Sequence, residues 1–209
     1  MVSINDKDAS LNEPKTDGTA SVVGLGVADA ELVICIANRP MIDDYPQLDH
    51  LRPLAAGELD HIVAHTSNHW RKVFNVFAKF LYSLANERMR AFSDWQSYRD
   101  QQLLQLGAKE ALCFSAPESF SSGRGRAGQT VFVIAGKTYA TQLKVSGLVW
   151  LDAYFAVHPT EPIVVSPYLD YRQLSNARID QLVGLVKQIR ARSLPESESS
   201  PEPDLELRW

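Results

Sequence analysis

The loop at residues 166–176 holds the side chains of this chain best suited to bind a ligand. It follows an apolar run and contains Tyr168, Asp170, Tyr171 and Arg172. The planar guanidinium of Arg172 suits a phosphate or a carboxylate, and the tyrosine rings suit stacking on a base or a sugar. A structural alternative stays open, in which Asp170 or Ser175 caps the next helix and Arg172 pairs with Asp170 to stiffen the turn.

Polar side chains follow two other apolar runs in the same way. Asn38 and Arg39 come directly after the first run, and Lys137 follows the third. In a parallel sheet these side chains emerge at one edge, where ligands of α/β proteins bind. We therefore predict one binding site, without assigned catalytic residues, formed by Asn38, Arg39, Lys137, Tyr168, Asp170, Tyr171 and Arg172.

Two glycine patterns resemble nucleotide-binding motifs but are incomplete. Ala135-Gly136-Lys137-Thr138 ends a strand and begins a helix, yet a P-loop needs a glycine where Val131 stands. Gly24-x-Gly26 precedes a strand, whereas a dinucleotide fingerprint follows one. The sequence therefore predicts neither a nucleoside triphosphatase nor a dinucleotide enzyme, and we expect no cofactor.

Three histidines recur at every fourth residue, at His61, His65 and His69. A zinc-protease pair requires a glutamate directly after the first histidine, and Ile62 stands there. Thr66-Ser67-Asn68 also indicates a helix break that takes His69 out of register. We predict no metal site.

Apolar runs alternate with helical periodicity along the chain. This pattern predicts an α/β fold, a three-layer α/β/α domain with a mostly parallel four-stranded sheet. The expected strands are 31–37, 111–114, 130–135 and 163–165, and the expected helices are 55–65, 70–84, a helix capped at Ser93, 138–144 and 176–192.

Charge is unevenly distributed along the 209 residues, which have a net charge of -4. Residues 32–193 carry 18 Lys+Arg and 14 Asp+Glu, while both flanks are acidic. A mildly basic body is compatible with anionic partners. We predict a single domain at 31–193 between disordered acidic segments at 1–30 and 194–209, and a mobile loop at 119–129.

Cys35 and Cys113 lie in apolar runs, as expected for buried thiols in a reducing compartment. The sequence has neither a signal-peptide core nor an apolar stretch long enough to span a bilayer. We therefore expect a cytoplasmic protein with no membrane partner; the sequence leaves its oligomeric state open.

The body of the chain resembles a bacterial protein family of small proteins with no assigned activity. The motifs that carry this resemblance are Ile-Ala-Asn-Arg-Pro (36–40), Trp-x-x-Tyr-Arg-Asp (95–100) and Ser-Pro-Tyr-x-Asp-Tyr-Arg-Gln-Leu-Ser-Asn (166–176). The resemblance covers roughly residues 31 to 190. It implies a family, but no substrate.

A fainter similarity is to the uracil-DNA glycosylase superfamily. It is carried by the order of the strands, in which a strand of the type Val-Phe-Val-Ile-Ala-Gly-Lys (131–137) leads into a helix and a last strand follows. The resemblance implies a glycosylase-like fold. This chain has Ser166-Pro167-Tyr168 where the superfamily has a His-Pro-Ser loop, and its own His158-Pro159-Thr160 precedes the last strand.

Three hypotheses for function follow. The first is a binding module for nucleic acid or a phosphorylated small molecule at the strand edge. The second is a nucleotide- or nucleobase-directed hydrolase with Asp43, Asp44 or Asp170 as the general base. The third is a protein-interaction module that presents the apolar faces of helices 69–85 and 176–192.

Overall fold

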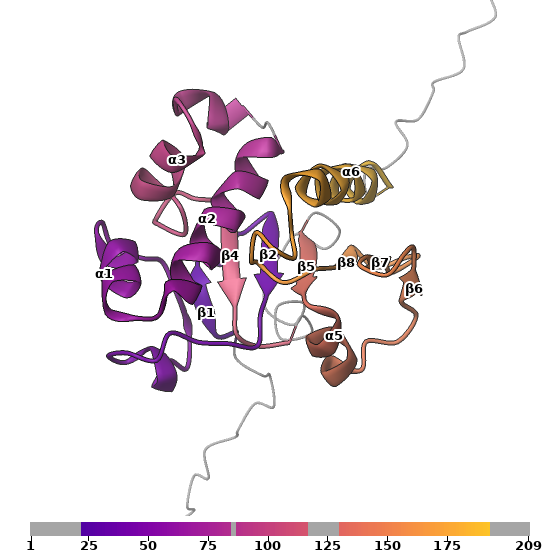
Figure 1. Ribbon diagram of the computed structural model, residues 1–209, viewed down its shortest axis with the longest axis horizontal. Helices are drawn as coiled ribbons and strands as arrows, with labels where there is room; N and C mark the ends of the chain where they lie inside the picture. The colour runs from indigo at the N-terminus through magenta and orange to yellow at the C-terminus, as the bar shows by residue number, and fades with distance from the viewer. Residues whose placement is uncertain (1–21, 85–86, 117–129, 193–209) are drawn as a thin grey trace, which may run out of the picture.

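A single mixed sheet organises the molecule. The computed structural model describes residues 22–84, 87–116 and 130–192. Its sheet has eight strands in the order β3-β1-β4-β2-β5-β8-β7-β6 (Figure 1). The strands are β1 Gly24–Gly26, β2 Leu32–Cys35, β3 Leu51–Arg52, β4 Glu110–Cys113, β5 Val131–Ala135, β6 Val149–Trp150, β7 Ala156–Val157 and β8 Ile163–Ser166.

The α/β class is confirmed, but the prediction of a four-stranded sheet is wrong. The four predicted strands are β4, β2, β5 and β8; they lie side by side and run parallel. Antiparallel pairs extend this centre on both sides, through β1 against β4 and β6–β7 against β8. The added strands have two or three residues each, too few to show a period-two pattern.

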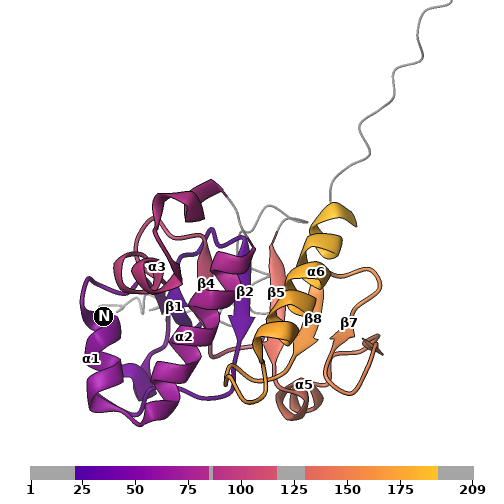
Figure 2. The same ribbon diagram turned by 45° about the horizontal axis from the view of Figure 1, so that its top comes forward.

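Helices cover the two faces of the sheet unequally. The described helices are α1 Glu58–His65, α2 Asn68–Ser83, α3 Trp95–Gln101, α5 Lys137–Leu143 and α6 Asn176–Arg192, with 3-10 turns η1 Tyr45–Gln47 and η2 Glu87–Ala91. Buried side chains of α1, α2, α3 and α6 share one apolar cluster with alternate strand residues. Figure 2 shows α2 and α6 in front of the strands. On the other face, α5 packs with β5, β7 and β8.

The apolar faces of α2 and α6 belong to this core. Phe74, Phe77 and Phe80 of α2 are fully buried, and so are Leu182 and Val186 of α6. These faces are therefore not available to a partner protein, and the interaction hypothesis built on them is wrong.

Strand β1 corrects the predicted start of the domain. Residues 24–26 lie within the segment 1–30 that the sequence predicts to be disordered, but they pair with β4 and β3. The two glycines have a packing role, since a Cβ on Gly26 would lie 2.7 Å from Cα of Ala111, and one on Gly24 would lie 2.9 Å from Cα of Cys113. The predictions for residues 1–21, 119–129 and 194–209 fall outside the described residues.

A buried carboxyl holds the turn after α3. The helix is capped by Asp94, which accepts from Ser97 N at 2.7 Å, and not by Ser93 as predicted. Leu104 then adopts a left-handed conformation with φ 60°. Glu110, only 2% exposed, fixes this strained residue by accepting from its backbone amide at 3.0 Å.

Both cysteines are buried, as expected, and burial raises the pKa of the Cys113 thiol to about 12. That thiol therefore stays protonated and is not a nucleophile at neutral pH. Among the described residues, no helix combines the length and apolar character that crossing a bilayer requires.

Candidate functional site

The loop after β8 is pinned to the core at two positions. Leu169 is 0% exposed and Leu174 is 1% exposed, and the amides of Gln173 and Leu174 both donate to the Asp170 carbonyl at 2.8 Å. Between these anchors the loop turns tightly, and this leaves Tyr171 as its most exposed large apolar side chain, at 56%. The two buried leucines and these backbone hydrogen bonds therefore fix the positions of the polar residues in the loop.

Asp170 joins this loop to α2. Its Oδ2 lies 2.9 Å from Nζ of Lys72, and its Oδ1 accepts from the Arg172 amide at 3.0 Å. Burial acts to raise the pKa of this carboxyl, but the Arg172 amide and Lys72 outweigh it and hold the pKa below the usual range. Asp170 is thus a structural clamp, close to the structural alternative considered above, although its ionic partner is Lys72.

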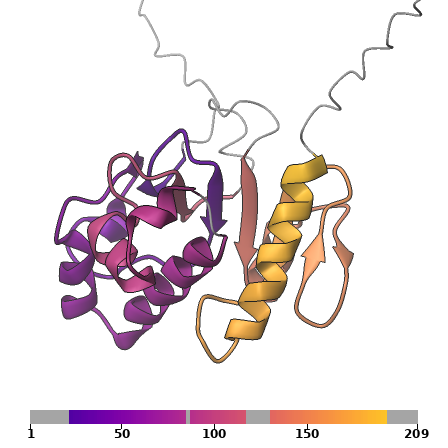
Figure 3. The ribbon, with the colours of Figure 1, turned by 90° about the horizontal axis from the view of Figure 1, so that it is seen from above.

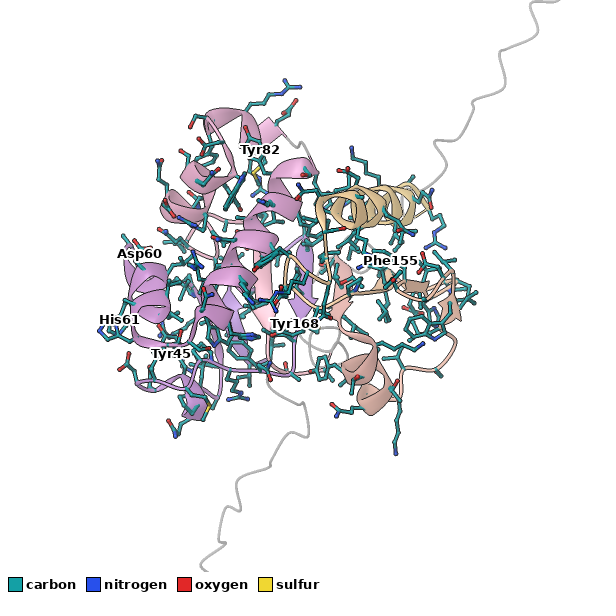
Figure 4. The ribbon with its side chains drawn as sticks, in the orientation of Figure 1. Tyr45, Asp60, His61, Tyr82, Phe155 and Tyr168 are labelled. Carbon is teal, nitrogen blue, oxygen red and sulfur yellow. The ribbon has the colours of Figure 1, made fainter. Side chains whose placement is uncertain are left out.

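Tyr168 reaches the first turn of α2 and the end of β2. Its hydroxyl lies 2.9 Å from Nε2 of His69 and accepts from Nδ2 of Asn38 at 3.3 Å, and its ring stacks on that of His69 with centroids 5.4 Å apart. Figure 4 shows Tyr168 near the centre of the molecule, between α2 and the strand ends. This contact brings together Asn38 and Tyr168 from segments 130 residues apart.

An open hollow, the edge pocket, lies beside this contact. Its volume is about 540 Å³, and its lining consists of Ala37, Asn38, Arg39, Met41, Pro46, Ser67, His69 and Trp70. Burial, reinforced by Lys72 against the attraction of Asp170, lowers the pKa of His69, so its imidazole is neutral at pH 7. Burial raises the pKa of Tyr168.

Lys137 does not converge with the other predicted residues, and of these only Asn38 lines the edge pocket together with Arg39. Arg39 lines the edge pocket, but its Nη1 donates to the carbonyls of Leu48 at 2.8 Å and Pro46 at 3.3 Å. Nζ of Lys137 lies 4.4 Å from the ring centroid of Trp150, on the far side of the sheet centre. The predicted single site is therefore split, since strand ends that share an edge still send long side chains in different directions.

A second hollow, the α2 groove, lies between α2, the start of α3 and the loop after β8. It measures about 240 Å³ and is lined by Arg71, Lys72, Asn75, Val76, Lys79, Trp95, Tyr171, Leu174, Asn176 and Ile179. Cations surround its two large rings: Lys72 and Arg172 lie 5.3 and 5.8 Å from the Tyr171 centroid, and Lys79 and Arg99 lie 5.0 and 5.7 Å from that of Trp95.

The groove has an excess of positive charge. Lys72 pairs with Asp170, and Arg99 pairs with Asp100. Within the described residues, no carboxylate forms an ion pair with Arg71, Lys79 or Arg172. Such an arrangement suits an anion that also has a flat or apolar part.

In the sequence, Arg71, Lys72, Asn75 and Lys79 fall largely away from the apolar face of the helix. Arg71, Asn75 and Lys79 recur at every fourth position and therefore share one face of α2. That spacing was the available signal. What it could not show is that Trp95 and Tyr171, from two other elements, would lie along the same face.

The carboxylates considered as general bases do not meet. Asp43 contacts His61 at 2.8 Å, Asp44 lies 3.9 Å from Arg52, and neither they nor Asp170 line the edge pocket or the α2 groove. Figure 4 shows His61 on the outer side of α1, far from Tyr168. No group of three or more His, Cys, Asp and Glu in the described part of the chain is arranged to hold a metal ion.

The sequence matches one known protein family. A model of a family of unknown function, DUF6942, matches residues 23–187. The chain belongs to the DUF6942 family. The match begins next to β1, in agreement with the place of that strand in the sheet.

No curated protein and no solved structure matches the chain. The similarity to uracil-DNA glycosylases therefore stays an expectation from the order of motifs. Because membership in DUF6942 brings no activity with it, the function of this member has to be argued from its own surface.

Proposed function

We propose that this DUF6942 protein binds single-stranded nucleic acid in the α2 groove. One observation carries the proposal: Arg71, Lys79 and Arg172, which have no ion-pair partner among the described residues, lie around a hollow that contains Trp95 and Tyr171. Cations that neutralise phosphates provide most of the affinity of such binding. Aromatic rings that stack on unpaired bases provide the rest.

The shape of the groove favours a single strand over a duplex. Proteins read double-stranded DNA by inserting a protruding helix or ribbon into its major groove, whereas here the cations line a concavity of about 240 Å³. A hollow of this size accepts one unstacked base beside Tyr171. The backbone phosphates of that strand then follow the face of α2 that carries Arg71 and Lys79.

The test is a fluorescence-anisotropy titration of the full chain with a labelled single-stranded oligonucleotide at low salt. We expect Arg71→Ala and Tyr171→Ala to weaken binding, the latter by about 1–3 kcal/mol if one base stacks on the ring. Lys187→Ala is the matched control, because Lys187 is an exposed lysine on α6 outside the groove. Equal affinities for wild type, Arg71→Ala and Lys187→Ala would remove the groove as the binding site.

A phosphorylated small molecule is the other ligand that the same charges fit. Competition separates the two, since a mononucleotide makes one phosphate contact where a strand makes several. We expect an oligonucleotide to displace the labelled strand at far lower concentration than a mononucleotide with the same base. Equal competition at equal phosphate concentration assigns the groove to a small ligand.

The edge pocket favours a second candidate function, a nucleobase-directed hydrolase. The specific observation is the chain Asn38–Tyr168–His69, in which a neutral imidazole able to accept a proton borders a hollow of about 540 Å³. Incubation with a uracil-containing single strand, followed by detection of abasic sites, tests this candidate. Absence of product, or product that persists in His69→Gln, rejects it.

We infer the cytoplasm as the compartment. Buried cysteines such as Cys35 and Cys113 are typical of proteins kept in a reducing environment. Fractionation of cells that express the tagged full chain checks this inference.

A further inference from the structure

The sheet ends in an exposed apolar hairpin that the α2 groove does not explain. Seven large apolar side chains are exposed among the described residues, and four of them lie within six positions of one another. These four are Val149 at 52%, Trp150 at 38%, Leu151 at 50% and Tyr154 at 45% exposed. Figure 3 shows the hairpin at the end of the sheet, beyond α6. We call these four residues the β6 patch.

The backbone of β6 is also open to another strand. Because β6 is last in the strand order, its inner edge pairs with β7 and its outer edge has no strand partner in the described part of the chain. An exposed, apolar edge strand is a ready template for one more strand and is usually protected in native proteins. A peptide that adds there gains backbone hydrogen bonds and buries alternate side chains.

The C-terminal residues have the pattern that such a strand requires. In Leu205-Glu206-Leu207-Arg208-Trp209 the apolar residues alternate with charged ones, so all three apolar side chains share one face of a strand. Val149 lies in β6 and Leu151 directly follows that strand, so these two apolar residues are likewise two positions apart. The apolar residues of the C-terminal segment therefore have the same spacing as Val149 and Leu151.

The chain leaves the described structure close to this edge. Arg192, the last residue of α6, donates through Nη1 to the Pro159 carbonyl at 3.0 Å, in the turn between β7 and β8. Val149 pairs with Val157, just before that turn. Residues 193–205 can span up to ~43 Å, whereas β6 lies about two strand spacings from β8, roughly 10 Å.

Charge favours the same contact. Residues 194–209 contain five acids and one base. Lys137 lies 4.4 Å from the Trp150 centroid and Arg178 lies 3.6 Å from the Tyr154 centroid, so cations border the apolar patch. Attachment to the same chain gives the segment an effective concentration in the millimolar range, which stabilises even a short strand.

We propose that residues 205–209 add to the outer edge of β6 as a further strand, with Leu205, Leu207 and Trp209 packed on Val149 and Leu151. The β6 patch is thereby a docking surface for the C-terminal segment of its own chain. This inference does not depend on the α2 groove.

Hydrogen–deuterium exchange on the full chain tests the proposal, together with its mass by light scattering. In the wild type we expect the amides of residues 149–151 and 205–209 to be protected at monomer mass. Leu207→Asp should make both sets exchange about tenfold faster or more, because local opening then has a lower free energy. Arg208→Ser, on the opposite face of the proposed strand, is the matched control and should retain protection.

Three outcomes overturn the proposal. Fast exchange of residues 149–151 in the wild type means that nothing covers the patch. Protection that survives in Leu207→Asp means that another part of the chain covers it. Protection that increases with protein concentration at dimer mass assigns the edge to β6 of a second copy.

Discussion

Replacement of Glu110 is the sharpest test of how this fold is held together. Its Oε1 accepts from the Tyr98 hydroxyl at 2.6 Å and from the Leu104 amide at 3.0 Å, and its Oε2 accepts from the Lys109 amide at 3.1 Å. These bonds tie α3 and the left-handed Leu104 to β4. Since α3 begins at Trp95, Glu110 also supports one wall of the α2 groove.

Two of the three donors, those of Tyr98 and Leu104, set the size of the effect. Glu110→Ala leaves the Tyr98 hydroxyl and the Leu104 amide without an acceptor in residues that are 2% and 0% exposed. Each buried unsatisfied donor costs about 1–3 kcal/mol, so we expect a loss of about 2–6 kcal/mol in the free energy of unfolding. Glu110→Gln keeps Oε1 for both donors and presents an amide nitrogen to Lys109, so its loss should be about 0.5–1.5 kcal/mol.

The difference in stability between wild type and Glu110→Gln should change with pH in a definite direction. Burial raises the pKa of Glu110 above its ordinary value of 4.5, against the opposing hydrogen bonds from Tyr98, Leu104 and Lys109. The folded state therefore binds this proton more tightly than the unfolded state does. The associated stability is complete below pH 4.5 and is lost as pH rises through the folded pKa.

Urea unfolding of wild type and Glu110→Gln over a range of pH measures this directly. Other carboxyls titrate equally in both proteins, so the difference in unfolding free energy isolates Glu110. We expect the advantage of the wild type over Glu110→Gln to shrink as pH rises above 4.5. An advantage that is constant or grows with pH refutes the reasoning, as does an Ala variant as stable as the Gln variant.

Three further predictions follow from other contacts. If three groove cations each neutralise one phosphate, log K for a single strand should fall against log salt with a slope of about -2, and Arg71→Ala should reduce this to about -1.4; an unchanged slope excludes Arg71. Asp170→Asn should remove the part of wild-type stability that is present above pH 3.8 and lost as pH falls through the lowered pKa, so acid unfolding curves of the two proteins should converge at low pH. Gly26→Ala should lower Tm by roughly 4 °C or more in a thermal melt, because φ is 115° and the added Cβ meets the β4 backbone; an unchanged Tm contradicts the packing role of β1.

The centre of the fold could be predicted because its strands are long enough to show their burial. Each of β2, β4, β5 and β8 is a run of four or five residues, nearly all buried. Their parallel direction agrees with the helical segments predicted between β2 and β4 and between β5 and β8. By contrast, β1 contains two glycines, which are depleted in strands, and β6 has only two residues, both exposed, so neither shows the buried apolar run of the central strands.

The Gly24-x-Gly26 pattern shows how a motif is misread without its context. As a sequence it resembles part of a nucleotide fingerprint. Its physical reason is the close approach of β1 and β4, where a Cβ on either glycine would overlap backbone atoms. Only the pairing partner makes that reason visible, and for Gly26 this partner is Ala111, 85 residues further along the chain.

For the candidate site, too, the sequence predicted what depends on local structure and missed what depends on contacts between distant segments. Sequence placed Asn38, Tyr168, Asp170, Tyr171 and Arg172 at strand ends, and Tyr168 does meet Asn38. It could not predict that Asp170 would be neutralised by Lys72 of α2, 98 residues away. Because of this ion pair, Asp170 holds the loop against α2 and is not a free carboxylate at the site. It also brings Tyr171 beside the face of α2 that carries Arg71 and Lys79. The proposed binding surface therefore lies along α2, whereas the sequence alone predicts a site at the edge of the sheet.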